Sequence, residues 1–209
     1  MNVIYLDNAD YRSIHQRMKD TLADRIAGNC PDTLILCEHS PVYTVGRRRN
    51  ATNNILNAHL VPIENVERGG DVTFHGPGQL VGYPILRLPD SKKDLHAYLH
   101  FLEDYWIDLL AQKGLAAATD ERNTGVWLAG KKLVAIGISC RRWVTWHGFA
   151  CNVDVDLQFF KNINPCGMAA DLVTRISDHL QSYPSVSDLA AEVATSFPLS
   201  WERFTNSSL

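Results

Sequence analysis

The sequence predicts an α+β fold built on a largely antiparallel or mixed sheet, and two observations lead to it. Short apolar, β-branched runs come in groups, and helical patterns separate the groups instead of alternating with single strands. The 209 residues are 45% hydrophobic and 21% charged, ordinary values for a globular protein that can bury a sizeable core. We therefore expect one domain over residues 1–209, with a small C-terminal lobe from about Asp154 as the alternative.

The first predicted element is a helix. Apolar residues recur every four positions along one face, at Ile14, Met18, Leu22 and Ile26. Asp7 or Asn8 is the expected N-cap, and Gly28 is the expected end of the helix.

Strand candidates follow this helix. Residues 33–37 and 42–45 are short β-branched, apolar runs, and residues 55–63 form a weaker candidate. Residues 80–88 read as another strand, in which Pro84 favours a place at a sheet edge because proline cannot donate a ladder hydrogen bond.

The second half begins with the clearest helix, over residues 94–112, which carries an apolar stripe. Residues 125–128 and 132–140 predict a hairpin that turns at Ala129-Gly130, and residues 144–153 predict a third strand beside it. The tail is mostly helical, with an apolar face formed by Val186, Leu189, Ala190, Val193 and Phe197.

Charge and hydropathy exclude several classes of protein. The formal net charge of −3 argues against binding nucleic acid by bulk charge, and the composition argues against a disordered or collagen-like chain. The N-terminus has neither a basic segment nor an apolar run before Asp7, so we expect no secretory signal. The longest apolar runs, such as residues 133–138, fall far short of the ~18 residues of a membrane span. We expect a cytoplasmic protein with reduced thiols.

A glycine-dense segment occupies residues 68–79. It does not fit a dinucleotide-binding motif, because Pro77 interrupts it and the flanking elements are wrong. It is not a phosphate-binding loop either, because no Gly-Lys-Ser/Thr follows. Two interpretations stay open: a tight turn between strands, or a site where bare backbone approaches a ligand closely. The polar side chains in this segment are Arg68, Thr73, His75 and Gln79.

The five cysteines pose a sharper question. An odd number without paired spacing argues against a disulfide framework, and the absence of C-x-x-C and H-x₃₋₅-H spacing argues against a zinc site. Cys30, Cys37, Cys140 and Cys151 read as small buried hydrophobic residues. Cys166 differs because it lies between Pro165 and Gly167, in a turn that can present a thiol to a cleft.

A nucleophilic cysteine needs a neighbouring base or cation, because the thiolate is the reactive form. Histidine is the usual partner, which nominates His75 and His147. Lys132 is the other candidate, since it abuts the apolar run of residues 133–136. Partial desolvation there would lower the lysine pKa toward the range of a working base.

Several motifs occur in a fixed order along the chain. They are E-H-x-P-V-Y-T-x-G-R over residues 38–47, R-G-G-x-x-T-F-H-x-x-G-Q over 68–79, K-L-V-A-I-G over 132–137, H-G-F-A-C-N over 147–152 and N-P-C-G over 164–167. Through them the stretch from about Leu34 to Gly167 resembles the lipoyl(octanoyl) transferases of the biotin/lipoate protein ligase superfamily. The resemblance implies a mixed sheet flanked by helices.

The resemblance also implies a mechanism. Cys166 would be the nucleophile that forms an acyl-thioester, and Lys132 would lower the cysteine pKa and act as acid and base. The positions that match the family's acyl site are Arg68, Gly69, Gly70, Asp71, Val72, Thr73, Phe74 and His75, then Ala135, Ile136 and Gly137, and finally Gly148, Phe149 and Ala150.

Substrates and partners follow from the same resemblance. The octanoyl or lipoyl group would come from acyl carrier protein and pass to a lysine on lipoyl domains of 2-oxoacid dehydrogenases and on the glycine cleavage H protein. Neither ATP nor a metal would be needed, and the enzyme would be a monomer that binds neither nucleic acid nor membrane. Arginines 47–49 and 141–142 are expected to dock the acidic protein partners.

Three rival functions stay open at this stage. The first is an ATP-dependent lipoate or biotin ligase of the same fold, which would need no thiol nucleophile. The second is a non-catalytic module that binds a carrier protein or a lipid. The third is a Cys/His hydrolase, which would depend on His75 or His147 instead of Lys132.

Overall fold

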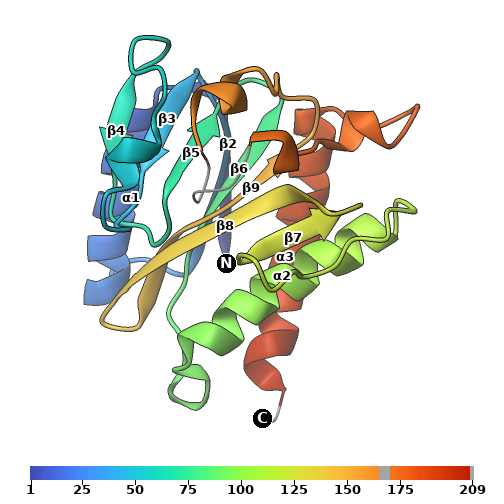
Figure 1. Ribbon diagram of the computed structural model, residues 1–209. Helices are drawn as coiled ribbons and strands as arrows, with labels where there is room; N and C mark the ends of the chain where they lie inside the picture. Colours follow the sequence, from blue (N-terminus) through green and yellow to red (C-terminus); the bar gives the residue numbers. More distant parts are fainter. Residues whose placement is uncertain (165–169, 208–209) are drawn as a thin grey trace.

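Two sheets form the framework of the protein (Figure 1). The computed structural model describes residues 1–164 and 170–207. The larger sheet has six strands in the order β1 (Asn2–Ala9), β2 (Thr33–His39), β6 (Gln79–Ile85), β9 (Val144–Asn152), β8 (Lys131–Arg141) and β7 (Gly125–Leu128). The smaller has three, in the order β4 (Ile63–Asn65), β3 (Val42–Val45) and β5 (Val72–His75). Only the β1–β2 and β3–β4 pairs are parallel, which confirms the predicted mixed sheet.

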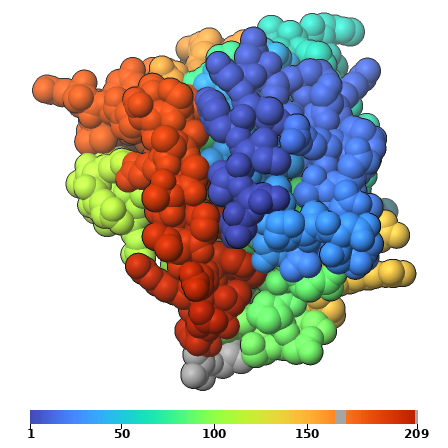
Figure 2. Space-filling model, turned by 180° about the vertical axis from the view of Figure 1, so that it is seen from behind, coloured from blue at the N-terminus to red at the C-terminus, as the bar shows by residue number. Residues whose placement is uncertain are grey.

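Three long helices cover the six-stranded sheet. Helix α1 (Tyr11–Ala27) packs on β6 and β9, while α3 (Val186–Asn206) packs on β2 and β6 and α2 (Leu95–Ala111) packs on β7 and β8 (Figure 1). From behind, α3 lies alongside the N-terminal strand (Figure 2). Short 3₁₀ turns make up the remaining elements: η1 (Ala51–Asn54), η2 (Asp90–Lys92), η3 (Phe159–Asn162), η5 (Ala170–Leu172) and η6 (Ile176–Asp178).

The burial of both faces of strand β2 explains its continuous apolar run over residues 34–37. Successive side chains in a strand point to opposite faces of the sheet. Leu34 and Leu36 join the apolar cluster beneath α2 and α3, and Ile35 and Cys37 join the cluster beneath α1. Both faces of this strand are therefore buried.

Pro84 occupies a central strand, so its predicted place at a sheet edge is wrong. β6 lies between β2 and β9, but the β6–β9 ladder ends at Gly82. Proline is tolerated here because its missing N–H falls beyond that ladder, while Leu34 of β2 pairs with it from the other side.

Helix α1 ends at Gly28 as predicted, and the remaining differences concern its N-cap, strand β1 and the loop before β4. Asp10, and not Asp7 or Asn8, caps α1 by accepting a hydrogen bond from the Ser13 N–H. Residues 2–9 form β1, a strand that the sequence pattern did not predict. Residues 55–62 form no strand, and β4 begins only at Ile63.

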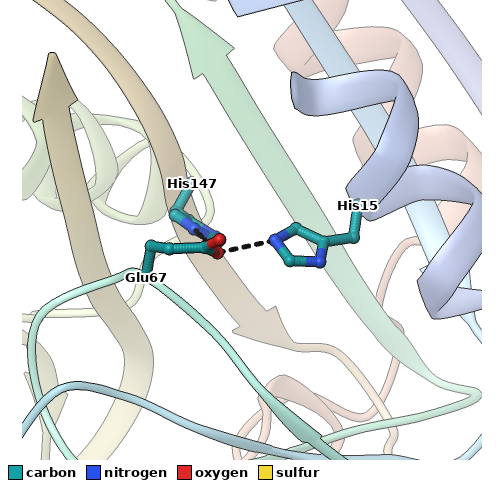
Figure 3. Close-up of side chains that lie close together, drawn as sticks. All are labelled: His15, Glu67 and His147. Atoms are coloured by element: carbon teal, nitrogen blue, oxygen red, sulfur yellow. Dashed lines mark hydrogen bonds and ion pairs between the residues drawn. The ribbon is translucent and has the colours of Figure 1, made fainter. Parts of the chain in front are cut away.

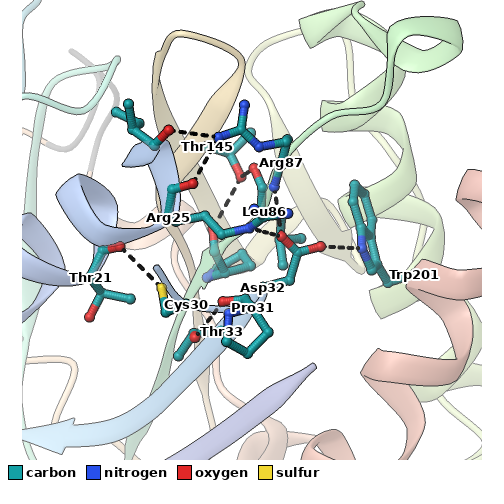
Figure 4. A network of polar contacts seen from close by, with 12 residues as sticks. Thr21, Arg25, Cys30, Pro31, Asp32, Thr33, Leu86, Arg87, Thr145 and Trp201 are labelled. Atoms are coloured by element: carbon teal, nitrogen blue, oxygen red, sulfur yellow. Dashed lines mark hydrogen bonds and ion pairs between the residues drawn. The ribbon is translucent and has the colours of Figure 1, made fainter. Parts of the chain in front are cut away.

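A partly buried carboxylate joins three elements at one end of the large sheet (Figure 4). Asp32 accepts hydrogen bonds from the Arg25 side chain at 2.6 Å, the Arg87 backbone N–H at 2.9 Å and the Trp201 indole N–H at 3.1 Å. These donors belong to α1, the segment after β6 and α3, so the contacts fix how the helices meet the sheet.

The C-terminal segment does not form a lobe of its own within the described residues. Val155, Phe160, Ile163 and Val173 pack into one apolar cluster with the three-stranded sheet, while α3 contributes to the main core. Among the described residues, none of the helices combines the length and the apolar character that crossing a membrane requires.

Candidate active site

A cleft of about 870 Å³, part of it open to solvent, lies where the two sheets and α1 meet. Its lining comes from the glycine-dense segment, from β5 and β6, and from β8 and β9. Lys132 lines it, as do all of the predicted acyl-site residues except one: Arg68, Gly69, Gly70, Asp71, Val72, Thr73, His75, Ala135, Ile136, Gly137, Gly148, Phe149 and Ala150. Segments far apart in the sequence therefore converge on one site.

The exception is Phe74, which does not belong to the lining. Its side chain is fully buried, stacked on Phe159 at a centroid distance of 4.5 Å and in edge contact with Tyr43. Because side chains alternate along β5, Phe74 points away from the cleft while His75 lines it. The prediction that Phe74 lines the acyl site is therefore corrected: its side chain supports the wall of the cleft from behind.

The glycine-dense segment joins the two sheets. The Gly69 N–H donates to the Ile138 carbonyl of β8 at 2.8 Å, and the Arg47 N–H donates to the Arg68 carbonyl at 3.0 Å. A Cβ on Gly46 would lie 2.5 Å from the Gly70 oxygen, so only glycine permits this approach. Of the two interpretations left open, close approach of bare backbone is the one that the cleft supports.

A chain of hydrogen bonds begins at Arg68. The Arg68 guanidinium donates to the Thr44 hydroxyl at 2.9 Å, and that hydroxyl lies 3.3 Å from His75 Nε2. His75 Nδ1 lies 2.7 Å from the Gln79 side-chain oxygen. Since an amide oxygen can only accept, this contact assigns the proton of His75 to Nδ1 and leaves Nε2 to accept from Thr44.

The same chain continues to Lys132. The Gln79 amide donates to Asn152 Oδ1 at 2.8 Å, and the Asn152 amide donates to the Thr174 carbonyl at 2.9 Å. The Thr174 N–H in turn donates to the Lys132 carbonyl at 3.0 Å. Buried polar groups that are all paired in this way hold one wall of the cleft rigid.

Lys132 is the buried member of the Lys131-Lys132 pair. It is 8% exposed whereas Lys131 is exposed, which confirms the partial desolvation predicted for it. Its Nζ donates to the Thr124 carbonyl at 2.9 Å and lies 5.1 Å from the centre of the Trp127 ring. Gly125 has a φ of +131°, and a Cβ there would overlap the Val134 carbonyl oxygen, so this position beside the lysine stem requires glycine.

Cys166 lies outside the described residues, and the structure places only the chain on either side of it. Before it, the Asn164 N–H donates to the Asn54 carbonyl at 2.7 Å. After it, Val173 lines the cleft and forms a bridge with Lys132. Both described neighbours of this segment are thus held by backbone contacts.

Of the other four cysteines, Cys37 and Cys151 are buried as predicted, whereas Cys30 and Cys140 are only partly buried. Cys37 and Cys151 are fully buried, and burial raises the pKa of each thiol well above its usual range. Burial also raises the pKa of Cys30 and of Cys140. These thiols stay protonated at neutral pH and are poor nucleophiles.

Three buried histidines surround the cleft as neutral groups. Burial lowers the pKa of His39 to about 4 and that of His75 to about 3. Burial and the charge of Arg68 lower the pKa of His147 to about 2. At neutral pH these imidazoles carry no charge, and none matches the near-neutral pKa that suits a general base.

His147 breaks the side-chain alternation of β9. Phe149 and Cys151 belong to the apolar cluster with α2 and α3, and strict alternation would send His147 to the same face. Its φ of +56° instead turns the ring toward His15 of α1, at a centroid distance of 5.8 Å. Non-glycine residues in this conformation are concentrated at functional sites.

Sequence analysis assigned no role to a group of aromatic and polar side chains beside the cleft. Tyr11 and Tyr83 both line it, and the Tyr83 hydroxyl lies 2.7 Å from His39 Nε2. The rings of Tyr11 and His39 are 5.1 Å apart. The only sequence signal for Tyr11 was its place on the apolar face of the first helix, which fits a core residue equally well.

Comparisons with known proteins identify the family of the chain. Residues 12–198 match the family model of the lipoyl protein ligase A/B catalytic domain. An octanoyltransferase from Geobacter metallireducens is 48% identical over 172 residues, which cover 82% of this chain and 80% of that protein.

Solved structures share the fold at low sequence identity. A lipoate-protein ligase A bound with ATP superposes with a TM-score of 0.71 at 15% identity, covering 98% of this chain and 94% of the other. The biotin protein ligase from Aquifex aeolicus gives a TM-score of 0.60 at 13% identity, covering 100% and 72%. These likenesses confirm the predicted biotin/lipoate protein ligase-like fold. The family model and the octanoyltransferase relative place the chain in the lipoyl protein ligase A/B catalytic domain family.

Proposed function

We propose that the cleft transfers an octanoyl group to a lysine of a lipoyl-domain protein through a thioester on Cys166, without ATP or a metal. The observation that carries this proposal is the convergence of Lys132 and the predicted acyl-site residues on one cleft. The octanoyltransferase relative supports octanoyl as the acyl group.

The proposed reaction has two halves. Lys132 accepts the thiol proton of Cys166, and the thiolate attacks the thioester carbonyl of octanoyl-acyl carrier protein. The carbon–sulfur bond to the carrier breaks, and the carrier thiolate takes the proton back from Lys132. The lysine amine of the acceptor then attacks the acyl-enzyme, its proton passes to Lys132, and Cys166 leaves as a thiolate. The amide product makes the second half favourable, so no ATP is consumed.

The cleft offers surfaces suited to an acyl chain. Val72, Val81, Ala135, Ile136 and Ala150 supply apolar walls. The buried position of Lys132 strengthens its interaction with a thiolate, because charges attract more strongly where water is excluded. The low pKa values of His75 and His147 make both imidazoles weak bases, which disfavours the Cys/His hydrolase.

The proposed partners are octanoyl- or lipoyl-acyl carrier protein as donor, and the lipoyl domains of 2-oxoacid dehydrogenases and the glycine cleavage H protein as acceptors. We propose that the enzyme works as a monomer.

A transfer assay separates this function from its nearest rival. Purified protein is incubated with a lipoyl domain and either octanoyl-acyl carrier protein alone or octanoate with ATP. The mass of the lipoyl domain is then measured by mass spectrometry. We expect modification only with the carrier-bound donor. Modification only with octanoate and ATP would identify a ligase, and release of free octanoate without modification would identify a hydrolase.

Lys132→Met tests the proposed proton transfer. The change keeps an unbranched apolar stem but removes the amine, so the transfer rate should fall by about 10²- to 10⁴-fold, the usual contribution of an acid–base group. Lys131→Met is the matched control, because this neighbouring lysine is exposed. Equal rates in Lys132→Met and wild type, with both proteins folded by circular dichroism, would rule out the role of Lys132.

A further inference from the structure

Three potential metal ligands from distant parts of the chain meet beside the cleft (Figure 3). They are His15 of α1, Glu67 before the glycine-dense segment, and His147 of β9. His15 Nε2 lies 2.7 Å from Glu67 Oε2, and His147 Nε2 lies 3.9 Å from the same oxygen. The ligand atoms all lie within 4.8 Å of one another.

His147 supplies the observation that points to a ligand. It is 1% exposed, and its Nε2 has no hydrogen-bond partner among the described residues. A buried polar atom without a partner costs free energy, so such atoms are rare in native proteins. In Figure 3 the His147 ring faces Glu67 and His15, the two other donors.

The donor set selects the class of ligand. Two imidazoles and one carboxylate suit first-row transition metals such as Zn²⁺ and Co²⁺, whereas Mg²⁺ and Ca²⁺ prefer oxygen donors. Donor atoms around a tetrahedral Zn²⁺ lie about 3.3 Å apart, as bond lengths of roughly 2.1 Å require. The distances of 2.7 and 3.9 Å bracket that spacing, so small side-chain movements suffice.

We propose that His15, Glu67 and His147 form a binding site for a divalent transition metal, separate from the acyl-transfer groups. Such an ion would join α1, β9 and the segment that leads into β5 beside the cleft, which His147 lines. It takes no part in the proposed transfer, which needs only Cys166 and Lys132. The sequence predicted no metal site because the three ligands are separated by 52 and 80 residues and belong to no ligand motif.

A neighbouring lysine, Lys19, affects how tightly this site binds a metal ion. Lys19 Nζ lies 3.2 Å from Glu67 Oε1, the carboxylate oxygen that does not face the histidines. Its positive charge competes with a bound metal for the carboxylate. Removing that charge should therefore tighten metal binding, which a purely structural histidine–glutamate contact would not predict.

The test is titration of metal-free protein with CoCl₂, followed by visible d–d absorption. We expect one Co²⁺ per chain, at least about tenfold weaker binding in His15→Ala and in Glu67→Gln, and tighter binding in Lys19→Gln. His100→Ala is the matched control, because His100 also contacts a glutamate, Glu103 at 3.2 Å, outside any three-ligand group identified among the described residues. This variant should bind as wild type does.

Two results would overturn the proposal. One is Co²⁺ affinity in His15→Ala equal to that of wild type. The other is a thiolate-to-cobalt charge-transfer band that disappears in Cys166→Ser, which would assign the ion to a cysteine. Folding is checked in parallel: ZnCl₂ should raise the Tm of wild type and of His100→Ala but not that of His15→Ala.

Discussion

The two faces of the six-stranded sheet have opposite characters. The face beneath α2 and α3 is closed by one large apolar cluster that includes Leu34, Leu102 and Leu189. On the other face, α1 covers only part of the sheet, and beside it lies the cleft with its buried histidines, tyrosines and Lys132. One layer of strands therefore separates the region that stabilises the fold from the region equipped for chemistry.

Single strands serve both regions. In β9, Cys151 packs into the apolar cluster, while Ala150 and His147 face the cleft. In β6, Leu80 belongs to the core, whereas Val81 and Tyr83 line the cleft. The core thus fixes the positions of the cleft residues through the shared backbone. Substitutions confined to one face should separate stability from activity.

The largest expected effect is on stability, from Leu189→Ala in α3. Leu189 is fully buried, so its truncation should lower the free energy of unfolding by about 2–5 kcal/mol. The transfer rate per folded molecule should not change, because Leu189 does not line the cleft. Urea denaturation and the transfer assay measure the two quantities.

Leu199→Ala on the same helix is the matched control. Leu199 is 52% exposed, and its truncation should change the free energy of unfolding by less than about 0.5 kcal/mol. Similar losses of stability in the two variants would contradict the assignment of the core to this face.

On the cleft face, His75→Gln should reduce the loss of folding stability that acid pH causes. Burial lowers the pKa of His75 to about 3, below the value near 6.5 of an unfolded histidine. The unfolded chain therefore binds an extra proton between about pH 6.5 and 3, and stability falls as the pH drops through this range. At pH 5 this costs about 2 kcal/mol, which the variant should avoid.

The comparison is between stability at pH 7 and at pH 5, by urea denaturation of each protein. His96→Gln is the control, because His96 is exposed on α2. The same loss between the two pH values in wild type and His75→Gln would mean that His75 is not held neutral in the folded state.

The smallest effect is expected at the exposed arginines of the two predicted docking clusters. Arg47, Arg49, Arg141 and Arg142 are exposed, whereas Arg48 lies 3.6 Å from the buried carboxylate of Asp71 and is best left intact. A surface ion pair contributes at most about 1 kcal/mol. Replacing Arg47 and Arg49, or Arg141 and Arg142, by glutamine should therefore raise KM for the acidic carrier protein by up to about fivefold. KM should also become less sensitive to salt. An unchanged KM at every salt concentration would remove these residues from the docking surface.

Sequence periodicity predicted most of the elements that build the apolar face. Helix α2, the β7–β8 hairpin and β9 have local patterns, and Ala129 and Gly130 adopt the positive φ angles of the predicted turn. β1 was missed because half-exposed edge strands carry little alternation. Pro84 was wrongly predicted at a sheet edge, because the local sequence does not show where a hydrogen-bond ladder ends within a central strand.

The candidate site was only partly predictable. The family motifs identified most of the cleft lining, because motif residues keep their order in the chain. The orientation of Phe74 depended on the register of β5, and the meeting of His15, Glu67 and His147 depended on the packing of three separate elements. Neither can be read from spacing along the sequence.

The proposed acyl-thioester is the central claim, and mapping it by mass spectrometry tests it most directly. Protein is incubated with octanoyl-acyl carrier protein without acceptor or ATP, digested and sequenced. We predict one octanoyl group on the peptide that contains Cys166, labile to hydroxylamine, and none on that peptide in Cys166→Ser. A wild-type protein that transfers octanoyl without such an adduct, or a hydroxylamine-labile adduct that persists in Cys166→Ser, would contradict the mechanism.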